Sequence, residues 1–142
     1  MFIDASAMVG ILARESDAEA ILARMSQAKT PFYVSSLSIL EAVMGLARAK
    51  ASRPDGQSVL TPELIEQAQQ AVGEFVNAIG AKEIPITNGI GRAAQEAAKR
   101  YGRLGAGSAK LNFGDCFAYA CSKAYRVPLL YKGDDFAKTD LA

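Results

Sequence analysis

Met1-Phe2-Ile3-Asp4-Ala5-Ser6 is the stretch on which the fold prediction depends. Two apolar residues lead directly into an aspartate, and a helical pattern follows from Met8 to Leu12. We therefore predict a very short buried strand that ends in a carboxylate and turns into a helix. Ligands of open α/β sheets bind outside the carboxyl ends of the strands, so Asp4 is a candidate site residue. The alternative is that Asp4 serves only as the N-cap of the helix.

Strands and helices are predicted to alternate along the rest of the chain. Strands are expected at 31–35, 83–86 and 127–131, the second of them near a sheet edge because it contains Pro85. Helices are expected at 16–28, 36–50, 61–80, 88–102 and 112–125, and polar or glycine-rich loops at 52–58 and 102–110. This alternation predicts an α/β fold, in which residues 1–142 form a single domain with a central parallel sheet and helices on both faces.

Composition limits the classes of function. Half of the 142 residues are apolar and 22% are charged, as in an ordinary soluble domain. The formal net charge of +1 does not indicate nucleic-acid binding, so any basic surface must be local. No apolar stretch approaches the length needed to span a membrane, and we expect a cytoplasmic protein.

The chain contains no histidine. This removes the commonest general base, the Ser-His and Cys-His nucleophile systems and the usual zinc ligand. The only cysteines, Cys116 and Cys121, lie five residues apart on one predicted helix and point to different sides, so we expect them to be buried core residues. Chemistry in this chain must therefore depend on carboxylates, hydroxyls, cysteine, lysine or a bound ion.

Acidic residues follow both the first and the last predicted strand. Asp4 ends the first strand, and Asp134 and Asp135 follow the last one. Carboxylates gathered at one end of a sheet repel each other unless a cation lies between them. The alternative for the second group is a solvated turn, because Gly-Asp-Asp is a typical turn sequence.

Two predicted helices carry further candidate acids. Glu41 falls at the edge of an apolar stripe formed by Leu37, Leu40, Met44 and Ala47, although Ser38 and Glu41 also have the spacing of a capping box. Asp115 lies in the first turn of a helix that is apolar or small nearly all round. Burial there costs solvation that a partner or ion must offset, unless the residue belongs to a cap around Asn112. Hard oxygen ligands without His or Cys suit Mg²⁺ or Mn²⁺, and such carboxylate cages are typical of nucleases.

Several motifs, in order along the whole chain, resemble those of the PIN-domain family, and specifically of VapC-like toxin ribonucleases from bacterial toxin–antitoxin pairs. The matching segments are Phe2-Ile3-Asp4-Ala5-Ser6-Ala7, Leu40-Glu41, Leu111-Asn112-Phe113-Gly114-Asp115-Cys116-Phe117, Pro128-Leu129-Leu130-Tyr131-Lys132-Gly133-Asp134-Asp135-Phe136 and Thr139-Asp140. The resemblance implies a parallel sheet with flanking helices, Mg²⁺ or Mn²⁺ binding, cleavage of single-stranded or loop RNA, a homodimer, and inhibition by a small VapB-like antitoxin.

The same resemblance implies a set of site residues. The first three acids would be Asp4, Glu41 and Asp115, and the fourth Asp135, with Asp134 left open. Ser6 and Asn112 match the residues that support the first and third acids. The segments 51–61 and 102–110 are longer than in compact members of the family, which leaves substrate preference and partner contacts open.

The mechanistic hypothesis is metal-assisted hydrolysis of RNA phosphodiesters. Asp4, Asp115 and Asp135 would hold one or two ions, with Glu41 bound directly or through water. Arg103, Lys110 and Lys132 are candidates for contacts with phosphate, although ordinary solvated charges would explain them equally well.

Two alternatives belong to other functional classes. The first is a PIN-like module that binds RNA or a partner without cutting, against which the complete acid set argues. The second is a phosphoacceptor domain of the response-regulator kind, which needs an aspartate after the middle strand, and residues 83–87 offer none. The glycine-rich segment 102–110 also lacks P-loop spacing, which argues against nucleoside triphosphate binding.

Overall fold

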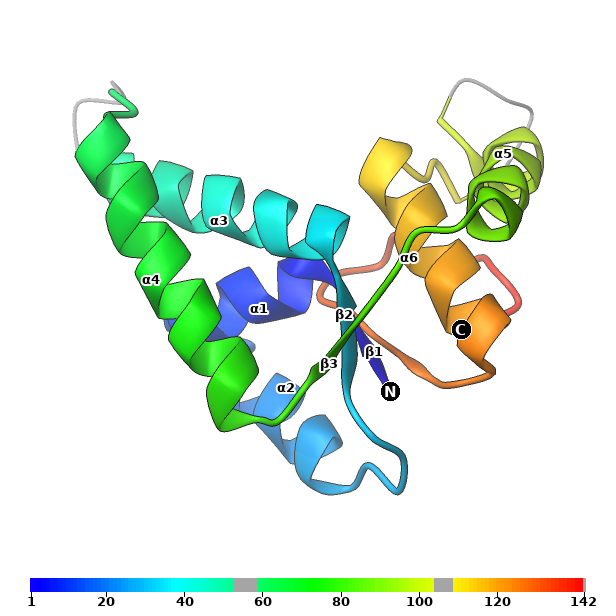
Figure 1. The fold of residues 1–142 in the computed structure, drawn as a ribbon, viewed down its shortest axis with the longest axis horizontal. Coiled ribbons are helices and arrows are strands. Elements are labelled where there is room, and N and C mark those ends of the chain that lie inside the picture. The colour runs from blue at the N-terminus through cyan, green and yellow to red at the C-terminus, as the bar shows by residue number, and fades with distance from the viewer. Residues whose placement is uncertain (53–58, 104–108, 142) are drawn as a thin grey trace.

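The computed structural model describes residues 1–52, 59–103 and 109–141. It contains four strands and six helices in these ranges (Figure 1). In chain order they are β1 Phe2–Ile3, α1 Ala5–Leu12, α2 Ala18–Ser26, β2 Tyr33–Ser35, α3 Ser36–Ala51, α4 Pro62–Ala78, β3 Lys82–Ile84, α5 Asn88–Tyr101, α6 Phe113–Tyr125 and β4 Leu129–Leu130. The loops predicted at 52–58 and 102–110 lie largely outside the described residues.

The strands form one parallel sheet in the order β3-β2-β1-β4. Phe2 pairs with Tyr33 on one side and with Leu129 on the other, so β1 is a central strand. The third predicted strand lies at a sheet edge, as its proline indicated. Because every strand runs in the same direction, the residues that follow β1, β2 and β4 meet at one edge of the sheet.

Alternating side chains of the strands divide the core into two parts. Phe2, Ile84 and Leu129 face a cluster built with α5 and α6, whereas Ile3, Val34 and Leu130 face a second cluster built with α1 to α4. Successive side chains of a strand point to opposite faces, so a two-residue strand contributes to both clusters. Figure 1 shows the two groups of helices on either side of the strands. The predicted α/β fold with helices on both faces is therefore confirmed.

Local signals set most helix boundaries. Thr61 caps α4 by accepting a hydrogen bond from the Leu64 N–H, with Pro62 at the first helical position. Beyond the end of α4, Gly80 adopts a positive φ of 61°, which glycine tolerates and other residues rarely do. Cys116 and Cys121 are buried free thiols, as predicted. No described helix is both long and apolar enough to cross a membrane.

The apolar stripe predicted for α3 was wrong in one position. Leu40 is 57% exposed, and the residues that α3 buries are instead Ser38, Ala42, Val43, Leu46, Ala47 and Ala51. The helix packs mainly against α1 and α4, so its buried face is rotated relative to the stripe inferred from its leucines. This rotation leaves Leu40 in solvent and places Glu41 at the border of the buried face.

Candidate active site

Asp4 lies directly after β1 and is the N-cap of α1. Its Oδ2 accepts hydrogen bonds from the Ser6 N–H (2.9 Å) and from the Ser6 hydroxyl (2.5 Å). The cap interpretation is thus confirmed. The side chain is only 4% exposed, yet it also borders a cavity at the carboxyl edge of the sheet. The same carboxylate therefore begins a helix and faces the candidate site.

Ser6 connects the first strand to the segment that follows the last one. Its hydroxyl donates to Asp4 and accepts a hydrogen bond from the Lys132 N–H at 3.0 Å. The two bonds use the donor and one acceptor position of a single hydroxyl. Ser6 therefore fixes the orientation of Asp4 relative to the exit of β4, where Asp134 and Asp135 follow.

Glu41 is partly buried on α3 and borders the same cavity. The capping box considered for Ser38 and Glu41 is not formed. Ser35 caps α3 instead, and the reciprocal hydrogen bonds join Ser35 to Ser38. Local capping therefore does not account for the position of Glu41.

The carboxylate of Glu41 lies against Gly114, in the first turn of α6. A Cβ atom at position 114 would overlap both carboxylate oxygens and Cδ of Glu41. Gly114 therefore allows α3 to place an acid directly against α6. Sequence reasoning missed this role, although glycine inside a helix is unfavourable and could have drawn attention to the position.

Asp115 is the third residue of α6 and is 8% exposed. Its Oδ2 accepts a hydrogen bond from the Asn112 N–H at 2.7 Å, and its own N–H donates to Asn112 Oδ1 at 3.0 Å. These two bonds form the capping box that the alternative interpretation required. Asn112 and Asp115 both border the cavity as well, so here too a capping residue faces the candidate site.

A cavity of about 320 Å³ brings together four carboxylates from distant parts of the chain: Asp4, Glu41, Asp115 and Asp135. Asp135 is itself exposed, and Asp134 is not among the residues that line the cavity. The structure therefore brings together all four acids of the preferred set. Glu15, which sequence analysis did not select, is a further lining residue.

The basic candidates differ in their surroundings. The ammonium of Lys132 forms an ion pair with Glu15 at the cavity wall, so its charge is already matched by a protein carboxylate. Arg103 is exposed, and its positive charge acts on Asp115 by lowering the pKa of that carboxyl. Lys110 is exposed and has a positive φ of 60°. Their assignment to phosphate contacts remains a prediction.

Burial and, to a smaller extent, mutual repulsion raise the pKa values of the acids that line the cavity. Burial is the main cause that raises the pKa of Glu41 to about 7, and the charges of Asp4 and Asp115 raise it further. Burial likewise raises the pKa of Asp115 to about 6, although the hydrogen bond from Asn112 opposes this shift. The pKa of Asp4 is also raised, by burial first and with a contribution from Asp135. A cation between these groups would relieve both costs.

The described residues provide no such cation from the protein itself. Within the ranges 1–52, 59–103 and 109–141, no lysine or arginine forms an ion pair with Asp4, Glu41 or Asp115. In the same ranges, no three His, Cys, Asp or Glu side chains are close enough to form a ready-made metal-binding group. Among the described residues, the acids therefore line one cavity without forming a compact cluster.

Comparison with known proteins identifies the family. The family model of the PIN domain matches residues 1–141. This chain belongs to the PIN-domain family. The resemblance inferred from the sequence motifs is therefore confirmed, and it extends over the whole described fold.

PIN-domain relatives of similar length are named VapC ribonucleases. One from Rhizobium meliloti is 39% identical over 140 residues, an alignment that covers 99% of this chain and 98% of the relative. Ribonuclease VapC30 of Mycobacterium tuberculosis is 36% identical over 142 residues, covering 100% and 96% of the two chains. Ribonuclease VapC28 of the same organism is 35% identical over 139 residues, covering 98% and 93%.

The raised pKa of Glu41 predicts how stability depends on pH. Below about pH 4.5 the carboxyl is protonated in both the folded and the unfolded protein, so it contributes nothing. As the pH rises toward 7, the unfolded state ionises first, and the free energy of unfolding falls. Glu41→Gln removes this loss. We expect the metal-free variant to exceed the wild type by on the order of 1–2 kcal/mol at about pH 8 and to match it near pH 4.5.

Chemical denaturation in chelator at the two pH values measures this difference. Glu96→Gln, at an exposed position on α5, is the matched control and should change stability by no more than about 0.5 kcal/mol. A Glu41→Gln variant whose advantage over the wild type is the same at both pH values would contradict the electrostatic account of the site.

Proposed function

We propose that this protein is an endoribonuclease that hydrolyses RNA phosphodiesters with the help of Mg²⁺ or Mn²⁺. The observation that carries the proposal is that Asp4, Glu41, Asp115 and Asp135 come from four separate segments to face one cavity. The names of the full-length relatives support ribonuclease as the activity. The absence of histidine agrees with a site that uses no protein nucleophile.

The chemistry of the donor set fits a hard divalent cation. Asp4, Asp115 and Asp135 would hold it directly, with Glu41 bound directly or through water. Carboxylate oxygens are the ligands that Mg²⁺ and Mn²⁺ prefer. Burial, and to a smaller extent mutual repulsion, raises the pKa of Asp4, Glu41 and Asp115, and a bound cation would offset both effects. Such an ion, when bound, lowers the pKa of water toward neutrality and stabilises the charge that develops on the phosphate.

The remaining residues of the site have positioning roles in this proposal. Ser6 holds the Asp4 carboxylate in one orientation through two hydrogen bonds, and Asn112 does the same for Asp115 through the capping box. Gly114 leaves room for the Glu41 carboxylate between α3 and α6. Residues that fix the orientation of ligands in this way affect the metal site without touching the substrate.

Partners follow from the same family membership. We propose RNA as the substrate and a small cognate antitoxin of the VapB kind as the inhibitor, which the name VapC of the relatives supports. We also propose that the protein forms a homodimer and acts in the cytoplasm.

The requirement for metal is tested with purified protein. Cleavage of a single-stranded RNA should stop in excess chelator and return when Mg²⁺ or Mn²⁺ is added in excess, because the ion activates the water and stabilises the charge that develops on the phosphate. Gel analysis of end-labelled RNA measures the extent of cleavage. Undiminished cleavage in chelator would contradict the metal mechanism, and binding of RNA without cleavage under every metal condition would favour the non-cutting module.

Asp115→Asn separates the two roles of this residue. Asparagine can still accept the hydrogen bond from the Asn112 N–H, so the cap survives while one charge leaves a repelling cluster. In chelator the variant should be at least as stable as the wild type, yet lose nearly all RNA cleavage. If Asp115 were only a cap, losing its charge would cost roughly 0.3–1 kcal/mol and activity would survive. Thermal melts paired with the cleavage assay distinguish these results.

The same assay tests which of the two adjacent aspartates is the fourth acid. Asp135→Asn should abolish most cleavage, because this side chain lines the cavity. Asp134→Asn is the matched control, one residue away and also exposed, and should keep most activity. The reverse pattern would assign the fourth position to Asp134.

Gly114→Ala tests the contact between α3 and α6. The new methyl group overlaps the Glu41 carboxylate, which must swing away because it is the mobile end of its side chain. We expect stability to change by no more than about 1 kcal/mol, since alanine is also the better helix former, while cleavage falls sharply. Gly73→Ala on α4 is the matched control, because a Cβ there meets nothing within 4 Å. Equal activity of both variants would remove Glu41 from the proposed mechanism.

A further inference from the structure

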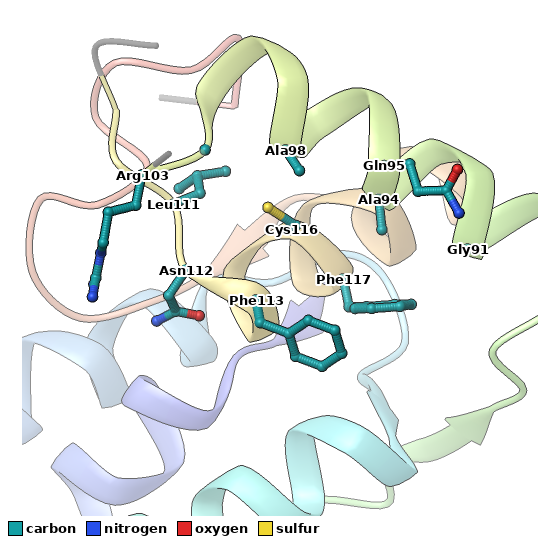
Figure 2. A pocket seen from close by; sticks show the side chains of 11 residues that line it. Gly91, Ala94, Gln95, Ala98, Arg103, Leu111, Asn112, Phe113, Cys116 and Phe117 are labelled. Atoms are coloured by element: carbon teal, nitrogen blue, oxygen red, sulfur yellow. The ribbon is translucent and has the colours of Figure 1, made fainter. Parts of the chain in front are cut away.

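A second and larger cavity, of about 570 Å³, lies between α5 and α6 (Figure 2). Leu111, Cys116 and Ala94 are buried beneath it, and its surface is mostly apolar. In Figure 2, Phe113 and Phe117 lie along α6 while Arg103 and Gln95 stand at opposite ends of the cavity. A cavity of this size with an apolar lining and a few polar groups at its rim has the character of a ligand site.

Phe113 is the most unusual residue of this cavity. Its side chain is 71% exposed, more than any other large hydrophobic residue among those described. Its ring lies 5.1 Å from that of Phe117, centroid to centroid, at an interplanar angle of 58°. An aromatic ring left this open adds little to folding, because it remains in contact with water. The backbone that carries the ring is nevertheless held in place, since Phe113 belongs to the first turn of a helix that is capped by Asn112.

The cavity adjoins the carboxylate site. Asn112 lines both cavities. Phe113 follows it directly and precedes Gly114, against which the Glu41 carboxylate lies. Phe113 therefore belongs to the same helix turn that contacts the acids.

The polar rim matches the groups of a nucleotide. Arg103 is exposed and carries a positive charge that suits a phosphate, while Gln95 and Asn112 offer amide donors and acceptors of the kind that read base edges. Unpaired bases are commonly bound by stacking on aromatic side chains, with hydrogen bonds to their edges. An apolar cavity with an open aromatic ring and this rim fits a base better than it fits a purely apolar ligand.

We propose that this cavity binds an unpaired nucleobase of the RNA strand, next to the phosphate that the carboxylate site cleaves. Phe113 is the stacking platform, and Arg103 contacts a neighbouring phosphate. The inference rests on the proposed ribonuclease function and gives one unpaired base of the substrate a binding place, because a base inside a duplex cannot reach the ring.

The absence of tryptophan from the chain permits a direct test. Phe113→Trp introduces the only indole, and stacking of a base on it should quench its fluorescence. The titrant is a short unstructured single-stranded RNA, added in chelator so that it is not cut and at low salt, where phosphate contacts are strongest. We expect quenching by this RNA, and little quenching by an abasic RNA of the same length or by the corresponding duplex.

Leu22→Trp is the matched control for the fluorescence experiment. Leu22 is also a large exposed hydrophobic residue, 46% exposed, but it belongs to α2, whose buried residues pack in the other core cluster. An indole there should not respond to RNA. Equal quenching at both positions would show non-specific contact and would overturn the proposal.

Two further variants separate base stacking from burial of an apolar surface. Phe113→Tyr keeps the ring and should bind RNA within about twofold of the wild type. Phe113→Leu keeps apolar bulk but loses the ring, and its dissociation constant should rise roughly 5- to 100-fold. If this face instead binds a second copy of the chain, the indole of Phe113→Trp should respond to protein concentration and not to RNA, which would overturn the proposal.

The outcomes for the cavity and for the proposed function are distinct. A wild-type protein that cleaves RNA, together with an unquenched Phe113→Trp that still binds RNA, would overturn the base site and leave the ribonuclease function standing. A wild-type protein that never cleaves, with a base-dependent quench at position 113, would support the base site and overturn catalysis.

Discussion

Several carboxylates line one cavity at one edge of the parallel sheet, and the rest of the structure must offset the cost of their burial and repulsion. Asp4, Glu41 and Asp115 are all at least partly buried, and the pKa of each is raised. Removing carboxylates from water and placing them near one another both reduce stability. The fold offsets this cost locally, since the backbone N–H groups at the starts of α1 and α6 donate to two of the three acids. Two core clusters, one on each face of the sheet, supply the stability that the edge lacks.

The close approach of α3 to α6 is part of the same arrangement of acids. Glu41 can be held against α6 only because position 114 has no side chain, and its carboxylate fills the space of the missing Cβ. A glycine in the first turn of a helix weakens that helix, and the capping box of Asn112 and Asp115 compensates at the same end. The start of α6 thus combines a helix-destabilising glycine with a stabilising capping box. The glycine makes room for Glu41, and the box orients Asp115.

Much of this arrangement could be predicted from the sequence because it depends on local patterns. The alternation of strands and helices, the two-residue strand before Asp4 and the edge position of the strand near Pro85 all follow from residue type and order. Asp4 and Asp135 could be selected because they follow strands, and the full set of four acids came from the resemblance to the PIN-domain family. What could not be predicted depends on packing across the fold. The rotation of α3 that exposes Leu40, the contact of Glu41 with Gly114 and the ion pair of Lys132 with Glu15 each join segments that are distant in sequence.

Helix capping and chemistry are not competing explanations for an acid in this fold. In Asp4 and Asp115 alike, capping bonds fall on Oδ2, so the cap orients a carboxylate that also lines the cavity. A side chain already ordered by folding loses little further entropy when it binds a ligand. The cap also supplies the backbone dipole that helps an acid to stay ionised despite burial. Capping therefore holds the carboxylates at this sheet edge in a fixed orientation before a metal ion or substrate binds.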